Sequence, residues 1–209
     1  MPYEPKDIVT SPDEIRSILG EAALNQRLKI IDHIDKHFSA WIARCPLIVI
    51  ASANAAGVID VSPKGDPAGF VRVLDSKTLA IPDRLGNRRG DTLMNILENP
   101  QLALLFIVPK RNEVVRVSGT ALVVKDRELR EEMAVQGKLP DLAIIVRVEK
   151  ALFHCGKAML RSHMWQPEKW RSIDGLPSYA QAVKDQGRPP ETLEELEERF
   201  SKNETERMY

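Results

Sequence analysis

The segment LAIPDRLGNRRGD, residues 79–91, is the starting point for our interpretation of the fold and of a candidate site. It starts as an apolar run, turns through a Gly-containing loop and leads into an amphipathic run. This order predicts a strand that ends at Pro82-Asp83 and a helix that Asn87, Arg88 and Arg89 open. Cations beside free backbone N–H groups at a helix start favour phosphate binding, and guanidinium groups add bidentate hydrogen bonds. The alternative is a solvated surface loop.

The composition limits the classes of protein to consider. A chain of 209 residues with 43% hydrophobic content can bury one sizeable core, so we expect a single domain with helical decoration. Thirty basic and thirty acidic residues give zero net charge, which argues against nucleic-acid or membrane binding and favours a small anion. Cys45 and Cys155 lie far apart and predict neither a disulfide framework nor a zinc site. With no secretion signal or membrane span in the sequence, we expect a cytoplasmic protein.

The two ends of the chain have helical patterns. Ser11-Pro12-Asp13-Glu14 is typical of a helix start, and a second apolar stripe at helical spacing runs from Ile30 to Ile42. We therefore expect residues 1–45 to form a helical extension that packs on the central domain. Residues 166–209 form a second helical extension, which contains an acidic helix at residues 191–199.

Residues 46–165 have the periodicity of strands. Residues 47–53 and 58–62 flank a turn and predict a β-hairpin, and residues 101–108 are apolar enough for a strand buried on both faces. With two short helices inserted, at residues 92–97 and 126–136, this part favours a small antiparallel barrel of about six strands. The other strand candidates are residues 70–74, 77–81, 112–124 and 141–153.

Classical catalytic patterns do not stand out. No hydrolytic triad is evident, so no catalytic side chain is assigned. His33 and His37 have the helical spacing of a metal-ligand pair, yet no Cys or H-E-x-x-H pattern accompanies them, and we predict no metal site.

Two further segments acquire meaning beside the basic turn. The loop SPKGDPAGF, residues 62–70, has backbone groups that can reach a flat heteroaromatic edge, although an ordinary turn is the alternative. Lys157, Arg161 and Trp165 would place two cations and an aromatic ring on one side of a helix, whose alternative role is structural.

Together these residues resemble the pyridoxamine 5'-phosphate oxidase-like family of FMN-binding split barrels, in its branch of probable FMN-dependent enzymes of unassigned substrate. The resemblance implies a mainly β protein with flanking helices, a six-stranded antiparallel split β-barrel and a homodimer with FMN at the subunit interface. It spans about residues 46–165, and the motifs that carry it are Ser62-Pro63-Lys64-Gly65-Asp66, Gly69-Phe70-Val71, Pro82-Asp83-Arg84, Gly86-Asn87-Arg88-Arg89, Asn99-Pro100, Arg116-Val117-Ser118-Gly119, Cys155-Gly156-Lys157-Ala158 and Arg161-Ser162.

The resemblance also implies a set of flavin contacts. Backbone around residues 66–71 would border the isoalloxazine ring, and Arg88 and Arg89 would bind the phosphate. Contacts within one chain would come from Ser62, Lys64, Asp66, Gly69, Phe70, Val71, Pro82, Asp83, Arg84, Asn87, Arg88 and Arg89. Contacts from the second subunit would come from Arg116, Lys157, Arg161 and Trp165.

The leading hypothesis is a cytoplasmic flavoprotein that acts as an FMN-dependent oxidoreductase. Lys64 or Lys157 would supply the cation that stabilises the anionic reduced flavin. Arg161-Ser162-His163 lies in a different motif from the substrate-reading Arg-x-His of the vitamin-forming members, so the substrate stays unassigned. A flavin storage or sensor protein without turnover is the alternative, and a relative that binds heme or a deazaflavin is the third hypothesis.

Overall fold

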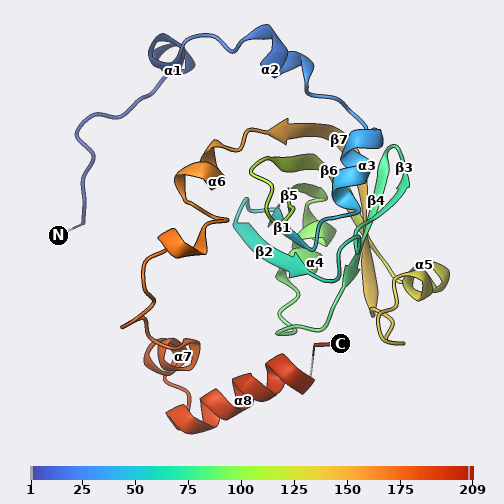
Figure 1. The fold of residues 1–209 in the computed structure, drawn as a ribbon, viewed down its shortest axis with the longest axis vertical. Helices are drawn as coiled ribbons and strands as arrows, with labels where there is room; N and C mark the ends of the chain where they lie inside the picture. The colour runs from blue at the N-terminus through green and yellow to red at the C-terminus, as the bar shows by residue number, and fades with distance from the viewer. Residues whose placement is uncertain (1, 207) are drawn as a thin grey trace.

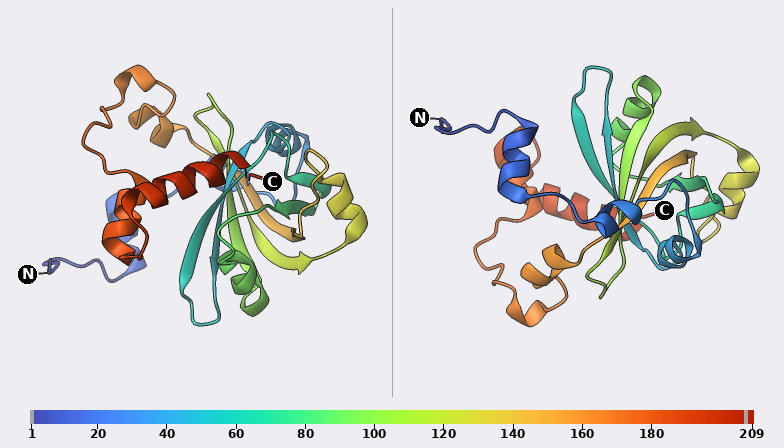
Figure 2. Two further views of the ribbon diagram at one scale, coloured as in Figure 1. Left: turned by 90° about the horizontal axis from the view of Figure 1, so that it is seen from below. Right: turned by 90° about the horizontal axis from the view of Figure 1, so that it is seen from above.

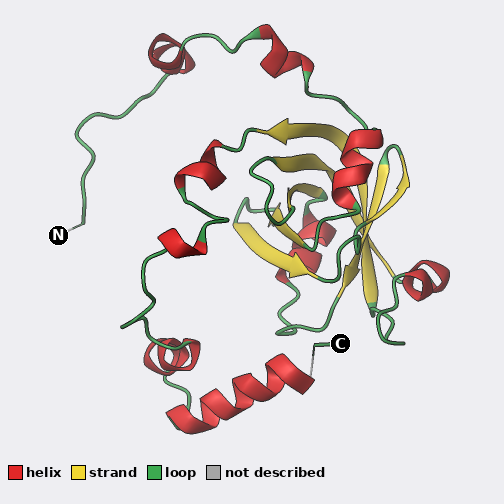
Figure 3. Cartoon of the chain, in the orientation of Figure 1, coloured by secondary structure: helices red, strands yellow, loops and turns green. Residues whose placement is uncertain are grey.

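The structure, a computed structural model, describes residues 2–206 and 208–209 and is built around one antiparallel sheet (Figures 1 and 3). Its seven strands follow the spatial order β2-β1-β5-β6-β7-β4-β3. The strands are β1 (Leu47–Ala53), β2 (Ile59–Gly65), β3 (Arg72–Asp75), β4 (Thr78–Asp83), β5 (Gln101–Ile107), β6 (Val114–Val124) and β7 (Leu142–His154). The helices are α1 (Pro12–Leu19), α2 (Leu24–Leu28), α3 (Lys36–Ile42), α4 (Asp91–Glu98), α5 (Arg127–Glu132), α6 (Lys157–Arg161), the 3₁₀ helix η1 (Pro167–Lys169), α7 (Tyr179–Gly187) and α8 (Leu193–Glu206).

The sheet curls into a split barrel that is not closed by strand pairing. β2 and β3 are its edges, and no ladder joins them among the described residues. β3 pairs with β4 only as far as Ala80, which leaves residues 81–83 of β4 free on that side. We call the gap between this free part of β4 and the free edge of β2 the open seam. The predicted mainly β split barrel is confirmed, with seven strands in place of the expected six.

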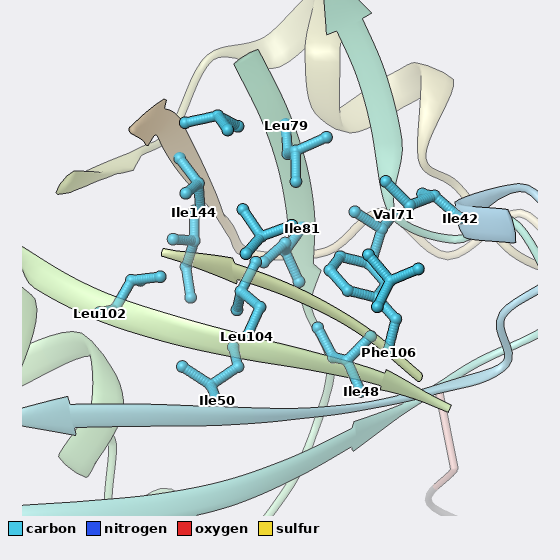
Figure 4. Close-up of a cluster of buried hydrophobic side chains, with 14 of the residues drawn as sticks. Ile42, Ile48, Ile50, Val71, Leu79, Ile81, Leu102, Leu104, Phe106 and Ile144 are labelled. Atoms are coloured by element: carbon cyan, nitrogen blue, oxygen red, sulfur yellow. The ribbon is translucent and has the colours of Figure 1, made fainter. Parts of the chain in front are cut away.

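The core fills the inside of the barrel, as Figure 4 shows. Alternate residues of β1 and β5 point inward, for example Ile48 and Ile50 of β1, whereas β4 is buried at every position from Thr78 to Pro82. Each fully buried aliphatic side chain contributes about 1.5–3 kcal/mol to the free energy of unfolding. The prediction that residues 101–108 are buried on both faces is wrong, because β5 exposes Gln101 and Ala103 on the outside of the barrel.

The helices outside the sheet differ in how they pack. Ser11 caps α1 as predicted, accepting a hydrogen bond from the Glu14 N–H group at 3.2 Å, yet α1 and α2 bury no residue. The helix predicted across the stripe from Ile30 is shorter, because Asp35 caps α3 and accepts from the N–H groups of His37 and Phe38.

The C-terminal helices form a hairpin beside the barrel (Figure 2). Ala180 of α7 and Leu196 of α8 are buried, and the rings of Tyr179 and Phe200 lie 4.9 Å apart, so the hairpin has a small core of its own. Within the described chain, no helix has both the length and the apolar composition that a membrane span requires.

The long β6–β7 ladder depends on a glycine. Its register shifts between Ser118 and Gly119, where the two backbones approach closely. A Cβ atom on Gly119 would lie 1.9 Å from the carbonyl oxygen of Arg147, so only glycine fits without a backbone shift.

We expect Gly119→Ala to lower the free energy of unfolding by about 3 kcal/mol, the upper end of the usual cost of overpacking. Urea denaturation measures this change. Gly86→Ala is the control, because a Cβ there meets nothing within 4 Å, and it should change stability by less than about 0.5 kcal/mol. Equal stability of the two variants would contradict the close approach at Gly119.

Candidate functional site

A cleft of about 910 Å³ lies along the open seam. Its volume falls in the range of small-molecule sites, about 300–1,000 Å³. One wall is β2, the opposite wall is the loop between β4 and α4, and a third segment precedes β7. The lining residues are Asp60, Val61, Ser62, Pro63, Lys64, Asp83, Arg84, Leu85, Gly86, Asn87, Arg88, Arg89, Gly90, Asp91, Thr92, Leu93, Met94, Lys138, Leu139, Pro140, Asp141 and Tyr209.

Two ion pairs cross the open seam where strand pairing does not. Asp66, directly after β2, accepts a hydrogen bond from Nε of Arg84 at 2.5 Å, and the Asp66 side chain is only 1% exposed. Arg84 also donates from Nη2 to the carbonyl oxygen of Met133 at 2.7 Å. Next to this pair, Nζ of Lys64 on β2 lies 3.7 Å from Oδ1 of Asp83 on β4. The cleft therefore has a base fixed by charged side chains.

We call residues 84–90 the basic loop. They place Arg84, Arg88 and Arg89 in the lining of the cleft. The N–H group of Arg89 donates to Oδ1 of Asn87 at 3.0 Å, and the Arg89 guanidinium pairs with Asp91 at 2.7 Å. Arg88 adopts a left-handed backbone with a φ of 61°, which is costly for a residue with a side chain. Within residues 2–206 and 208–209, no ion pair or hydrogen bond engages the Arg88 side chain.

The start of α4 differs from the prediction made from the sequence. The helix begins at Asp91 with Gly90 as its N-cap, so Asn87, Arg88 and Arg89 precede the helix rather than open it. The reason is the left-handed backbone at Arg88 and at Gly90, which prevents the helix from extending backwards. No side-chain hydrogen bond caps this helix start, so N–H groups of the first turn stay available to a ligand.

Burial perturbs one carboxyl group in the cleft. Desolvation raises the pKa of Asp83 above its usual value, and the positive charge of Lys64 offsets part of that rise. The carboxylate of Asp141 raises the pKa of Asp83 further. The lining of the cleft therefore combines the cations Arg88 and Arg89 with a carboxyl group that resists ionisation.

The structure brings part of the predicted site together. The residues of that set that line the cleft are Ser62, Lys64, Asp83, Arg84, Asn87, Arg88 and Arg89. Asp66 and Pro82 flank it, while the side chains of Phe70 and Val71 lie in the core next to Gly69. A role for residues 69–71 through their backbone stays a prediction.

The remaining predicted residues lie elsewhere on the same chain. Arg116 lines a second, smaller cavity of about 300 Å³ together with His154 and Cys155. Lys157 and Arg161 are exposed on α6, and Nε1 of Trp165 donates to the carbonyl oxygen of Arg111 at 2.8 Å. Their assignment to a flavin bound by a second subunit stays a prediction.

Four parts of the cleft are absent from the sequence prediction, and the first of them is residues 92–94 in the first turn of α4. Asp60 alternates with Ser62 and Lys64 along β2, a period-two signal that was available in the sequence. Residues 138–141 reach the cleft because Leu142 of β7 pairs with Asp83 of β4, and nothing local in the sequence indicates that register. Tyr209 reaches the cleft from the far end of the chain, again without a local signal.

We expect Asp83→Asn to stabilise the protein at pH 7. Because the pKa of Asp83 is raised in the fold, the unfolded state binds fewer protons between the ordinary pKa, about 4, and the raised value, so ionisation costs stability as the pH rises. The gain from Asn should vanish below about pH 4, where both states are protonated. Denaturation at pH 3 and pH 7 measures this, and a gain that is equal at both values would contradict the assignment.

The solved structures that the chain resembles cover a little more than half of it. HupZ from Group A Streptococcus is 21% identical, with 56% of this chain and 91% of that chain covered and a TM-score of 0.47. A putative pyridoxamine 5'-phosphate oxidase from Lactobacillus delbrueckii is 20% identical, with coverages of 58% and 95% and a TM-score of 0.46. HutZ from Vibrio cholerae, titled a heme storage protein, is 11% identical, with coverages of 58% and 94% and a TM-score of 0.41.

Two sequence comparisons gave different results. No curated protein sequence matches the chain. The family model described as pyridoxamine 5'-phosphate oxidase matches residues 34–155, which make up more than half of the 209 residues and include β1 to β7. The chain belongs to the pyridoxamine 5'-phosphate oxidase family.

Proposed function

We propose that this protein is a cytoplasmic, homodimeric FMN-binding flavoprotein that acts as an FMN-dependent oxidoreductase on a substrate still to be assigned. The observation that carries the proposal is the basic loop at one end of a cleft large enough for a small molecule. Members of the family commonly bind flavin and are typically dimeric.

The phosphate end of the cleft has a suitable donor set. Arg88 and Arg89 both line the cleft, and α4 starts beside them without a side-chain cap. Guanidinium groups bind phosphoryl oxygens through paired, charge-assisted hydrogen bonds, and a helix start adds N–H donors. Arg88 is held in a costly left-handed conformation, which is the kind of strain found at functional sites.

The wall of the cleft that β2 forms suits the ring system. β2 is a sheet edge, so the free side of its backbone offers hydrogen-bonding groups to a flat heteroaromatic edge, with Pro63 contributing only a carbonyl acceptor because proline has no N–H group. Bound FMN would supply the hydride and electron transfer there. Lys64 would hold a positive charge beside the ring, and Asp83 would orient the Lys64 ammonium group.

The second subunit is part of the proposal. Arg116, Lys157, Arg161 and Trp165 do not line the cleft of their own chain. In the homodimer these residues would complete the cleft of the other subunit. The two cleft sites of the dimer would then be equivalent.

We expect the double variant Arg88→Ala/Arg89→Ala to bind FMN at least about 100-fold more weakly, because each lost charge-assisted hydrogen bond contributes about 1.5–3 kcal/mol. Fluorescence titration with FMN and with riboflavin, which lacks the phosphate, measures the change. The wild type should prefer FMN strongly, and the double variant should bind the two ligands about equally.

The matched control is Arg16→Ala/Arg27→Ala, which removes the same charge from α1 and α2, outside the cleft. It should retain the affinity of the wild type for FMN. A double variant at Arg88 and Arg89 that still prefers FMN to riboflavin would refute the phosphate assignment. A wild type that takes up neither ligand would refute flavin binding altogether.

The oxidoreductase part requires that a small donor reaches the bound cofactor. We expect that NADH, NADPH or a small organic donor bleaches the flavin absorbance of the loaded protein under anaerobic conditions. Stopped-flow absorbance with a panel of donors measures this, with dithionite as the positive control. Bleaching by dithionite alone would favour storage or sensing of flavin without turnover.

A further inference from the structure

The C-terminal end of the chain lies beside the barrel (Figure 1), and Tyr209 lines the cleft. The phenol group of Tyr209 donates a hydrogen bond to Oδ1 of Asp66 at 2.8 Å. The guanidinium carbon of Arg84 lies 5.8 Å from the centre of the Tyr209 ring, within the range of a cation–π contact. Tyr209 therefore contacts both members of the buried ion pair that crosses the open seam.

The Asp66 carboxylate accepts a different donor at each of its two oxygens, and Tyr209 is one of those donors. The Asp66 side chain is only 1% exposed, Oδ2 accepts from Arg84 and Oδ1 accepts from Tyr209. A buried carboxylate needs hydrogen-bond donors at both oxygens, because an unpaired charge in the interior is costly. The hydrogen bond to Asp66 raises the pKa of the Tyr209 phenol, because the bond favours the protonated form that donates it.

The contact also joins two parts of the protein that have separate cores. α8 packs on α7 around Ala180 and Leu196, and α8 ends at Glu206. Tyr209 then lies in the cleft, 143 residues along the sequence from its partner Asp66. If the Tyr209 side chain were released, the cleft would open beside Asp66 and Arg84 while every strand kept its partners.

We propose that Tyr209 is a ligand-binding residue and a latch: its ring forms a removable wall of the cleft and covers the planar ring of the bound cofactor. The hydrogen bond to Asp66 holds the wall closed. The cofactor part of this inference rests on the proposed function, whereas the latch itself concerns only Tyr209, Asp66 and Arg84.

The latch is testable in the full chain without flavin. Tetranitromethane modifies accessible tyrosines, and the chain carries two internal references, Tyr3 at 89% and Tyr179 at 72% exposure. We expect Tyr209 to be nitrated at least about tenfold more slowly than both, the factor that a hydrogen bond to a charged acceptor contributes. Mass spectrometry of the peptides measures the rates, and equal rates at the three tyrosines would overturn the latch.

The wall is testable by the release of FMN. We expect Tyr209→Ala to release FMN about tenfold faster than the wild type, with Tyr209→Phe between the two because it keeps the ring and loses the hydroxyl group. Tyr3→Ala is the matched control and should release FMN at the wild-type rate. Stopped-flow fluorescence after dilution measures release.

The outcomes separate this inference from the proposed function. Wild-type release from Tyr209→Ala would overturn the wall. A wild type that binds no FMN would refute the proposed function and the wall, while the nitration rates would still decide the latch. Slow nitration of Tyr209 together with fast release from Tyr209→Ala would support the whole inference.

Discussion

The buried ion pair between Asp66 and Arg84 is the constraint on which the rest of the site depends. β2 and β4 lie at opposite sides of an open sheet, and no backbone ladder joins them among the described residues. Charged side chains hold the two sides together instead, at 2.5 Å for this pair and 3.7 Å for Lys64 and Asp83. Removing one partner of a buried pair typically costs about 3–5 kcal/mol, so both charges must stay. The cleft exists because the barrel is closed in this way.

The side chains of the site are held partly by strands of the sheet and partly by a loop. β2 and β4 are parts of a packed sheet, and they fix Lys64 and Asp83. The basic loop follows directly from β4 and is kept in shape by Asn87 and by the pair of Arg89 with Asp91. The cleft therefore has a base fixed by packed strands and a loop whose shape depends on its own hydrogen bonds.

Local residue patterns explain how much of this was predictable. The β1–β2 hairpin and the alternation in β6 follow from period-two burial, and Asn54 closes the hairpin by accepting from the N–H groups of Ala56 and Val58. The cleft residues between 62 and 89 were predictable because they lie in two contiguous motifs. Residues 138–141 and Tyr209 were not, because their positions depend on the register of β7 and on the path of the C-terminal helices.

The seam of side chains also has an evolutionary consequence. A barrel closed by backbone hydrogen bonds can change its diameter only if a strand is added, lost or shifted in register. Here substitutions at the less buried pair, Lys64 and Asp83, would reset the width and polarity of the opening while every strand keeps its partners and the Asp66–Arg84 pair stays in place. Such a scaffold can acquire new ligand preferences by point mutation alone, since Lys64 and Asp83 both cross the opening and line the cleft.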